Sequence, residues 1–190
     1  MPASTAGLGL PFVWSSGYSV EAFDNYTNLA MPNSKNAVKA ARPRSRKLIE
    51  DMLQERQQML VLLWELSKLD LSKPDEATRQ TLEDFQEILV DYIAAAHFGL
   101  YQRIAEGNER RQAVLDIARE IYPRIARSTD IAVEFTEKYD NPEAGTDTAK
   151  LPDDLSLLAE EVTTRIELED KLILAMVGGD FPIPKVPRTA

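Results

Sequence analysis

The chain has 190 residues, a length that supports one domain with a substantial hydrophobic core. Hydrophobic residues make up 44% and charged residues 28%, as in ordinary soluble globular proteins, and the absence of cysteine excludes disulfides and thiolate metal sites. The net charge of −9 disfavours nucleic acid as a partner and favours a basic protein.

Residues 1–44 are predicted to form a flexible, mostly unstructured arm, because Gly, Ser, Pro and Asn are frequent and no helical period is sustained. The arm contains an apolar island that can pack on the body or bind a partner: Phe12, Val13, Trp14 and Tyr18. It has no basic segment before an apolar stretch, so we expect no secretion signal and a cytoplasmic location.

Six basic residues and no acid lie in the segment 35–47, which we interpret as a solvated linker or a weak phosphate contact. From Leu48 onward the chain holds 16 basic and 29 acidic side chains, a net charge of −13. The acidic character therefore belongs to the body of the protein.

Hydrophobic periodicity predicts four helices, at about residues 45–69, 75–105, 108–139 and 152–178. Pro123 lies inside the third helix and is expected to kink or split it. No stretch alternates with the two-residue period of a strand, so we predict an all-α fold, an antiparallel bundle of four main helices over residues 45–178. The proline-rich residues 179–190 should form an extended tail.

The second helix is apolar on two sides. One stripe should face the core, at Leu82, Leu89, Ile93, Ala96, Leu100 and Ile104. Asp91, Ala95, Phe98 and Gln102 fall on the opposite side, and Ala94 lies nearby. An aromatic ring beside a carboxylate and small residues, on a face that helices usually give to water, predicts a docking surface at Asp91, Ala94, Ala95 and Phe98.

His97 is the only histidine of the chain and has two interpretations. As a structural residue it would sit at the edge of the core and bond to an acid of the fourth helix, forming a polar cluster with Glu167 or Asp170. As a functional residue it would carry a phosphoryl group, as in histidine-phosphotransfer domains. Those domains usually have a lysine three residues after the histidine, where this chain has Leu100.

Enzymatic chemistry is not expected. A ferritin-type di-iron site needs two Glu-x-x-His motifs, and one histidine cannot supply them. The chain also lacks a glycine-rich phosphate loop and a nucleophile elbow. We therefore predict no catalytic residues, no metal and no cofactor, and no run of apolar residues is long enough to span a membrane.

Two sequence blocks resemble the regulator-of-sigma-D (Rsd/AlgQ) family of anti-sigma factors. They are VDYIAAAHFGLYQRI in the second helix and RIELEDKLI in the fourth, and the similarity covers roughly residues 47–177. The resemblance implies a helical bundle that binds the primary sigma factor of RNA polymerase at its −35-recognition domain and keeps it from the core enzyme. It also implies that Asp91, Phe98 and Leu48 contact sigma.

The chain departs from that family in places. Ala94 stands where the family has a serine, and Asp51 and Met52 stand where it has an Arg-Trp pair. A signalling adaptor that uses His97 or the acidic surface remains an alternative, and an uncovered aromatic patch can also support self-association.

Overall fold

The computed structural model describes residues 35–140, 148–179 and 181–184, and every regular element within these ranges is helical. Four long helices dominate: α2 (Lys35–Leu66), α3 (Glu76–Ala96), α5 (Gln112–Tyr139) and α6 (Leu151–Val177). A π-helical segment, η1 (His97–Tyr101), continues α3 into the short α4 (Gln102–Ala105), and a 3₁₀ turn, η3 (Thr148–Lys150), precedes α6. The predicted all-α fold is confirmed.

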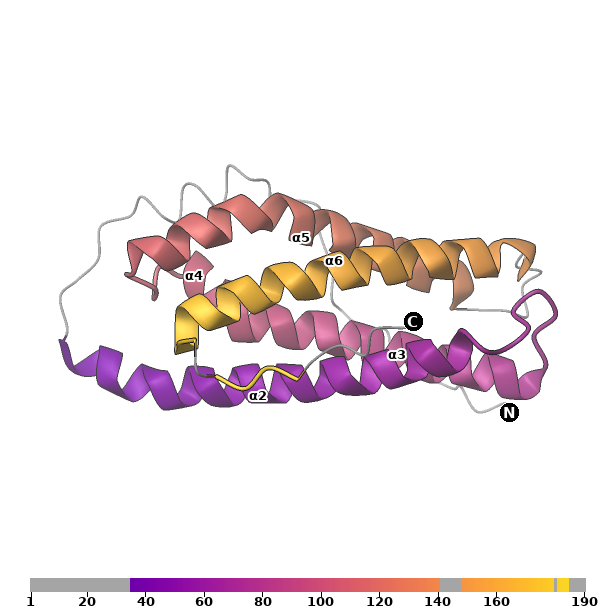
Figure 1. The fold of residues 1–190 in the computed structure, drawn as a ribbon, viewed down its shortest axis with the longest axis horizontal. Helices are drawn as coiled ribbons and strands as arrows, with labels where there is room; N and C mark the ends of the chain where they lie inside the picture. Colours follow the sequence, from indigo (N-terminus) through magenta and orange to yellow (C-terminus); the bar gives the residue numbers. More distant parts are fainter. Residues whose placement is uncertain (1–34, 141–147, 180, 185–190) are drawn as a thin grey trace, which may run out of the picture.

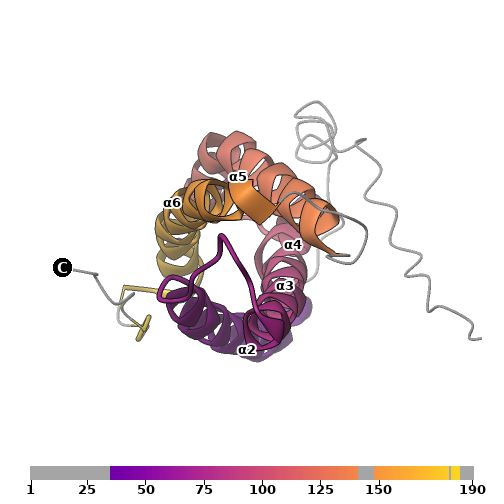
Figure 2. The same ribbon diagram turned by 90° about the vertical axis from the view of Figure 1, so that its right-hand side faces the viewer.

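The four long helices form an antiparallel bundle, arranged around a ring in the order α2, α3, α5 and α6 (Figure 1, Figure 2). The closest packing joins α2 to α3 and α5 to α6, so the bundle consists of two helical hairpins placed face to face. All six residues of the predicted core stripe on the second helix are buried: Leu82, Leu89, Ile93, Ala96, Leu100 and Ile104. This face of α3, η1 and α4 is therefore core, as predicted.

The first helix begins at Lys35, ten residues before the predicted start at Ser45. The segment 35–42 is rich in Ala, Lys and Arg, which are strong helix formers, and this propensity extends the helix into the predicted arm. The prediction of unstructured chain over residues 35–44 is therefore wrong. Residues 1–34 and 185–190, most of the predicted arm and the end of the predicted tail, lie outside the described residues.

The remaining helix boundaries have local causes. The Asp75 carboxylate caps α3 by accepting from the backbone N–H of Thr78 at 2.8 Å. Pro123 does not split α5, which is continuous from Gln112 to Tyr139 with the proline exposed to solvent. Gly178 ends α6 with a φ of 107°, a conformation that favours glycine.

The chain after α6 turns back along α2 (Figure 1). The described residues 181–184 of the predicted tail are not helical. Phe181 is buried, and the guanidinium of Arg46 lies 5.1 Å from the centre of its ring. This contact fixes the tail against the N-terminal half of α2.

Candidate docking face

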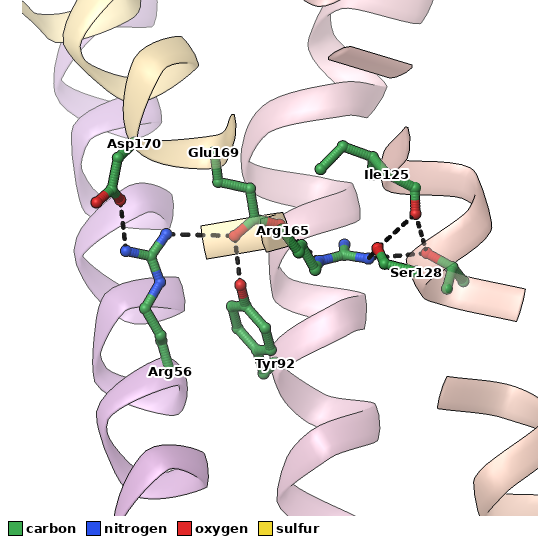
Figure 3. A network of polar contacts seen from close by, with 8 residues as sticks. Arg56, Tyr92, Ile125, Ser128, Arg165, Glu169 and Asp170 are labelled. Atoms are coloured by element: carbon green, nitrogen blue, oxygen red, sulfur yellow. Dashed lines mark hydrogen bonds and ion pairs between the residues drawn. The ribbon is translucent and has the colours of Figure 1, made fainter. Parts of the chain in front are cut away.

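A buried polar network lies beneath α3 and connects all four long helices (Figure 3). We define it as Arg56 of α2, Tyr92 of α3, Ser128 of α5, and Arg165, Glu169 and Asp170 of α6. Glu169 is its centre, because its fully buried carboxylate accepts from the Tyr92 hydroxyl, from Arg56 Nη2 at 3.2 Å and from Arg165 Nε at 2.7 Å.

The two arginines carry the network outward from Glu169. Arg56 Nη1 donates to Asp170 Oδ1 at 2.6 Å, and Arg165 Nη1 reaches across to the Ser128 hydroxyl on α5 at 3.3 Å. Two cations face two anions, so the buried charges balance. A charge buried without such partners would cost several kcal/mol, and the balance lets the bundle bury Arg56, Arg165 and Glu169, while Asp170 is half-buried.

Tyr92 is held as a hydrogen-bond donor by its surroundings. Burial and then the Glu169 carboxylate raise the pKa of Tyr92 well above its usual range, so the hydroxyl keeps its proton. The guanidinium carbons of Arg56 and Arg165 lie 6.0 and 5.7 Å from the centre of its ring. Because Tyr92 directly follows Asp91, these contacts fix the inner side of the helix that presents Asp91 outward.

The π-helical segment η1 brings α2 against the end of α3. Gly99 lies so close to α2 that a Cβ at this position would stand 3.3 Å from the backbone oxygen of Leu48 and 3.7 Å from its Cβ. A residue without a side chain suits this approach best. The contact places Leu48, from a distant part of the sequence, beside the residue that follows Phe98.

The outer surface here is the candidate docking face, which we define as Leu48, Asp91, Ala94, Ala95 and Phe98. Phe98 is 45% exposed, Leu48 is 36% exposed, and Asp91 is also exposed. Ala94 and Ala95 are half-buried, and Ala95 packs partly against the core. Val90, which sequence reasoning missed, is exposed four residues before Ala94 and extends the apolar part of this helix surface.

His97 packs against the docking face from the side of the core. Its half-buried ring meets the Phe98 ring edge to face, with the ring centres 5.3 Å apart. Burial and then the positive charge of Arg165 lower the pKa of His97, so the imidazole is neutral at neutral pH.

The sequence predicts Glu167 or Asp170 of α6 as the acidic partner of His97. Asp170 pairs with Arg56, and the Glu167 side chain is exposed. Two acids of α6 are buried, Glu161 and Glu169. The network uses Glu169, which was not among the predicted site residues. Its signal was available in the spacing, because Arg165 and Glu169 are four residues apart on the face that also carries Ile166, Leu172 and Ile173.

The described residues offer no arrangement of three or more His, Asp or Glu side chains suited to a metal ion. None of the helices within the same ranges is long and apolar enough to cross a membrane. The exposed aromatic and aliphatic groups of the docking face are suited to contact with another protein.

Comparison with known proteins identifies the fold's family. The sequence model of the Rsd/AlgQ family, described as "Regulator of RNA polymerase sigma(70) subunit", matches residues 31–177. The chain belongs to the Rsd/AlgQ family.

Curated proteins named "Regulator of sigma D" are similar to this Rsd/AlgQ member. One from Yersinia enterocolitica is 29% identical over 133 residues, covering 68% of this chain and 80% of the relative. One from Salmonella newport is 29% identical over 155 residues, covering 77% of this chain and 91% of the relative. No solved structure matches the chain.

The Rsd/AlgQ match contains the whole docking face and the whole buried network, while residues 1–30 fall outside it. Membership of this family makes the protein a regulator of the sigma(70) subunit, an anti-sigma factor. It favours that role over phosphotransfer by His97, whose ring is half-buried against Phe98.

Proposed function

We propose that this chain binds sigma(70) through its docking face, at the −35-recognition domain, and so keeps sigma from the core RNA polymerase. The close approach of Gly99 to Leu48 carries the proposal, because it joins exposed residues of α2 and α3 into one surface. We further propose that the protein acts by occlusion alone, without catalysis, and that it does so in the cytoplasm.

Two kinds of contact would hold sigma on this face. The Phe98 ring would fill an apolar pocket of sigma, as buried aromatic anchors do at protein interfaces. The Asp91 carboxylate would pair with an arginine or lysine of sigma. A promoter-reading domain is basic because it binds DNA, and the net charge of −13 from Leu48 onward attracts such a surface.

Phe98→Ala tests the apolar anchor. We expect the substitution to weaken sigma(70) binding by about 2 kcal/mol, roughly thirtyfold in Kd. Because Phe98 is an exposed side chain, the melting temperature should stay close to that of the wild type. Isothermal titration calorimetry against purified sigma(70) measures the binding change.

Leu157→Ala is the matched control, because Leu157 is 49% exposed on α6 and lies outside the docking face. It removes a similar amount of exposed apolar surface and should leave the affinity unchanged. If Phe98→Ala and Asp91→Ala both bind sigma(70) like the wild type, the docking face is wrongly assigned.

Asp91→Asn tests the ion pair separately. The wild-type affinity should fall as salt is raised from about 0.05 to 0.5 M, because screening weakens exposed charge pairs. The substitution keeps the shape of the side chain without its charge, so the variant should bind less tightly at low salt and show a smaller salt dependence. Equal salt dependence in both proteins would remove Asp91 from the interface.

A signalling adaptor with other partners is the second candidate, since the acidic surface could serve it equally well. Capture of partners from a lysate with the intact protein separates the two. The anti-sigma proposal expects sigma(70) among the captured proteins and its loss with Phe98→Ala.

A further inference from the structure

A second apolar surface lies at the opposite end of α2 from the start of the helix. It is a groove of about 970 Å³ between the C-terminal part of α2, the α2–α3 turn and the N-terminal part of α6. Leu60, Val61 and Trp64 line one side, and Leu155 and Ala159 line the other. We call this surface the apolar groove.

The apolar groove exposes more hydrophobic surface than a solvated groove normally would. Trp64 is 53% exposed, and Val61 and Leu69 beside it are exposed as well. Among the described residues that line the groove, Asp70 is the only charged one, in a chain with 28% charged residues. Contiguous apolar surface of this kind marks a place where another segment binds.

The chain itself carries a segment with matching chemistry. Residues 1–20 contain no charged side chain, and they include Phe12, Val13, Trp14 and Tyr18. Bringing such a segment into the groove removes hydrophobic surface from water and desolvates no charge of the segment itself; the charges at the groove are those of Asp70 and of Lys68, whose ammonium lies over the Trp64 ring.

The length of the segment permits the contact. The groove residue Val61 lies 26 residues after Lys35, where α2 begins, which is about 39 Å along a helix. The 21 residues from Trp14 to Lys35 can span up to about 69 Å when extended. The aromatic residues can therefore reach the groove from the start of α2.

We propose that the apolar groove is the docking site of the protein's own N-terminal segment, with Phe12, Val13 and Trp14 seated against Trp64, Leu60 and Leu155. The family match begins at residue 31, so this contact is a property of the present chain beyond the sigma-binding function of the family. It also leaves the docking face free for sigma.

The two tryptophans of the chain, Trp14 and Trp64, stand on opposite sides of the proposed contact and make it measurable. In the full-length Trp14→Phe protein, Trp64 is the only tryptophan, and the seated segment should shield it from acrylamide. Adding Phe12→Asp and Val13→Asp should release the segment, at least double the quenching constant of Trp64 and shift its emission to the red.

The matched control adds Ser4→Asp and Thr5→Asp to the same Trp14→Phe protein, which places the same charges outside the aromatic part of the segment. This control should quench like Trp14→Phe alone. Equal quenching in the two double-Asp proteins would overturn the proposal.

The absence of cysteine allows a second test by disulfide formation. Ser16→Cys combined with Ser156→Cys, at the groove edge, should close as a monomer at least ten times faster than Ser16→Cys combined with Glu120→Cys on α5. Equal rates, or a cross-linked dimer in place of the monomer, would overturn the proposal. A tenfold gain in sigma(70) affinity in the Phe12→Asp, Val13→Asp protein would do the same, because it would place the segment over the docking face.

Discussion

At the scale of single residues, His97 is the side chain whose protonation state is most sensitive to pH changes near neutrality. It is the only histidine, and burial together with Arg165 lowers its pKa in the folded protein below the ordinary value of 6.5. The unfolded chain therefore binds a proton at a higher pH than the folded chain does. The neutral form of His97 favours folding above pH 6.5. This contribution to the free energy of unfolding is lost as the pH falls from 6.5 through the lower pKa of the folded state.

We accordingly expect the free energy of unfolding to decrease as the pH is lowered below about 6.5. His97→Gln keeps a polar side chain of similar length without the titrating ring, and it should flatten this part of the pH profile. Urea unfolding at about pH 7.5, 6.5 and 5.5 measures both proteins. An unchanged slope in His97→Gln would assign the acid sensitivity to other groups.

At the scale of elements, the contact between η1 and α2 determines the shape of the docking face. A methyl group on residue 99 would meet the backbone oxygen of Leu48 at 3.3 Å, and a backbone atom in a packed helix yields little. Gly99→Ala should therefore push η1 from α2 and destabilise the fold by about 1–3 kcal/mol, as overpacking does.

The same substitution should also weaken sigma(70) binding, because it separates Leu48 from Phe98 without removing either side chain. Thermal unfolding and calorimetric titration measure the two effects. Ala95→Gly, which alters a half-buried helical position nearby, controls for the cost of changing Gly and Ala in this region. A Gly99→Ala protein that binds and melts like the wild type would show that the approach tolerates a methyl group.

How far the elements could be predicted depends on how local their causes are. The inner stripe of the second helix follows from its 3.6-residue period, and all of its members are buried. The sequence did not predict the π-helical segment His97–Tyr101. The need for glycine at position 99 arises from the neighbouring α2, which no local pattern records. The helical period predicts that Phe98 and Asp91 are exposed. It does not predict that Leu48 of another helix lies next to them.

At the scale of the whole molecule, the buried network joins two hairpins that pack closely within themselves and more sparsely with each other. Asp170 was predicted in a polar cluster, but Arg56 and Glu169 were not singled out, because each resembles an ordinary surface residue of an amphipathic helix. Only the assembled bundle shows that they face each other across α2 and α6. Ionic pairing at this depth specifies which helices are neighbours, in addition to the apolar core.

Glu169→Gln tests the network at its centre. The substitution preserves shape but leaves Asp170 as the remaining carboxylate of the network for Arg56 and Arg165, so buried positive charge goes uncompensated. We expect a loss of about 3–5 kcal/mol in the free energy of unfolding. Glu167→Gln, an exposed neighbour on α6, is the control and should stay within about 0.5 kcal/mol of the wild type. Urea unfolding of the wild type and the two variants measures these free energies. Similar stability in both variants would mean that apolar packing alone holds the two hairpins together.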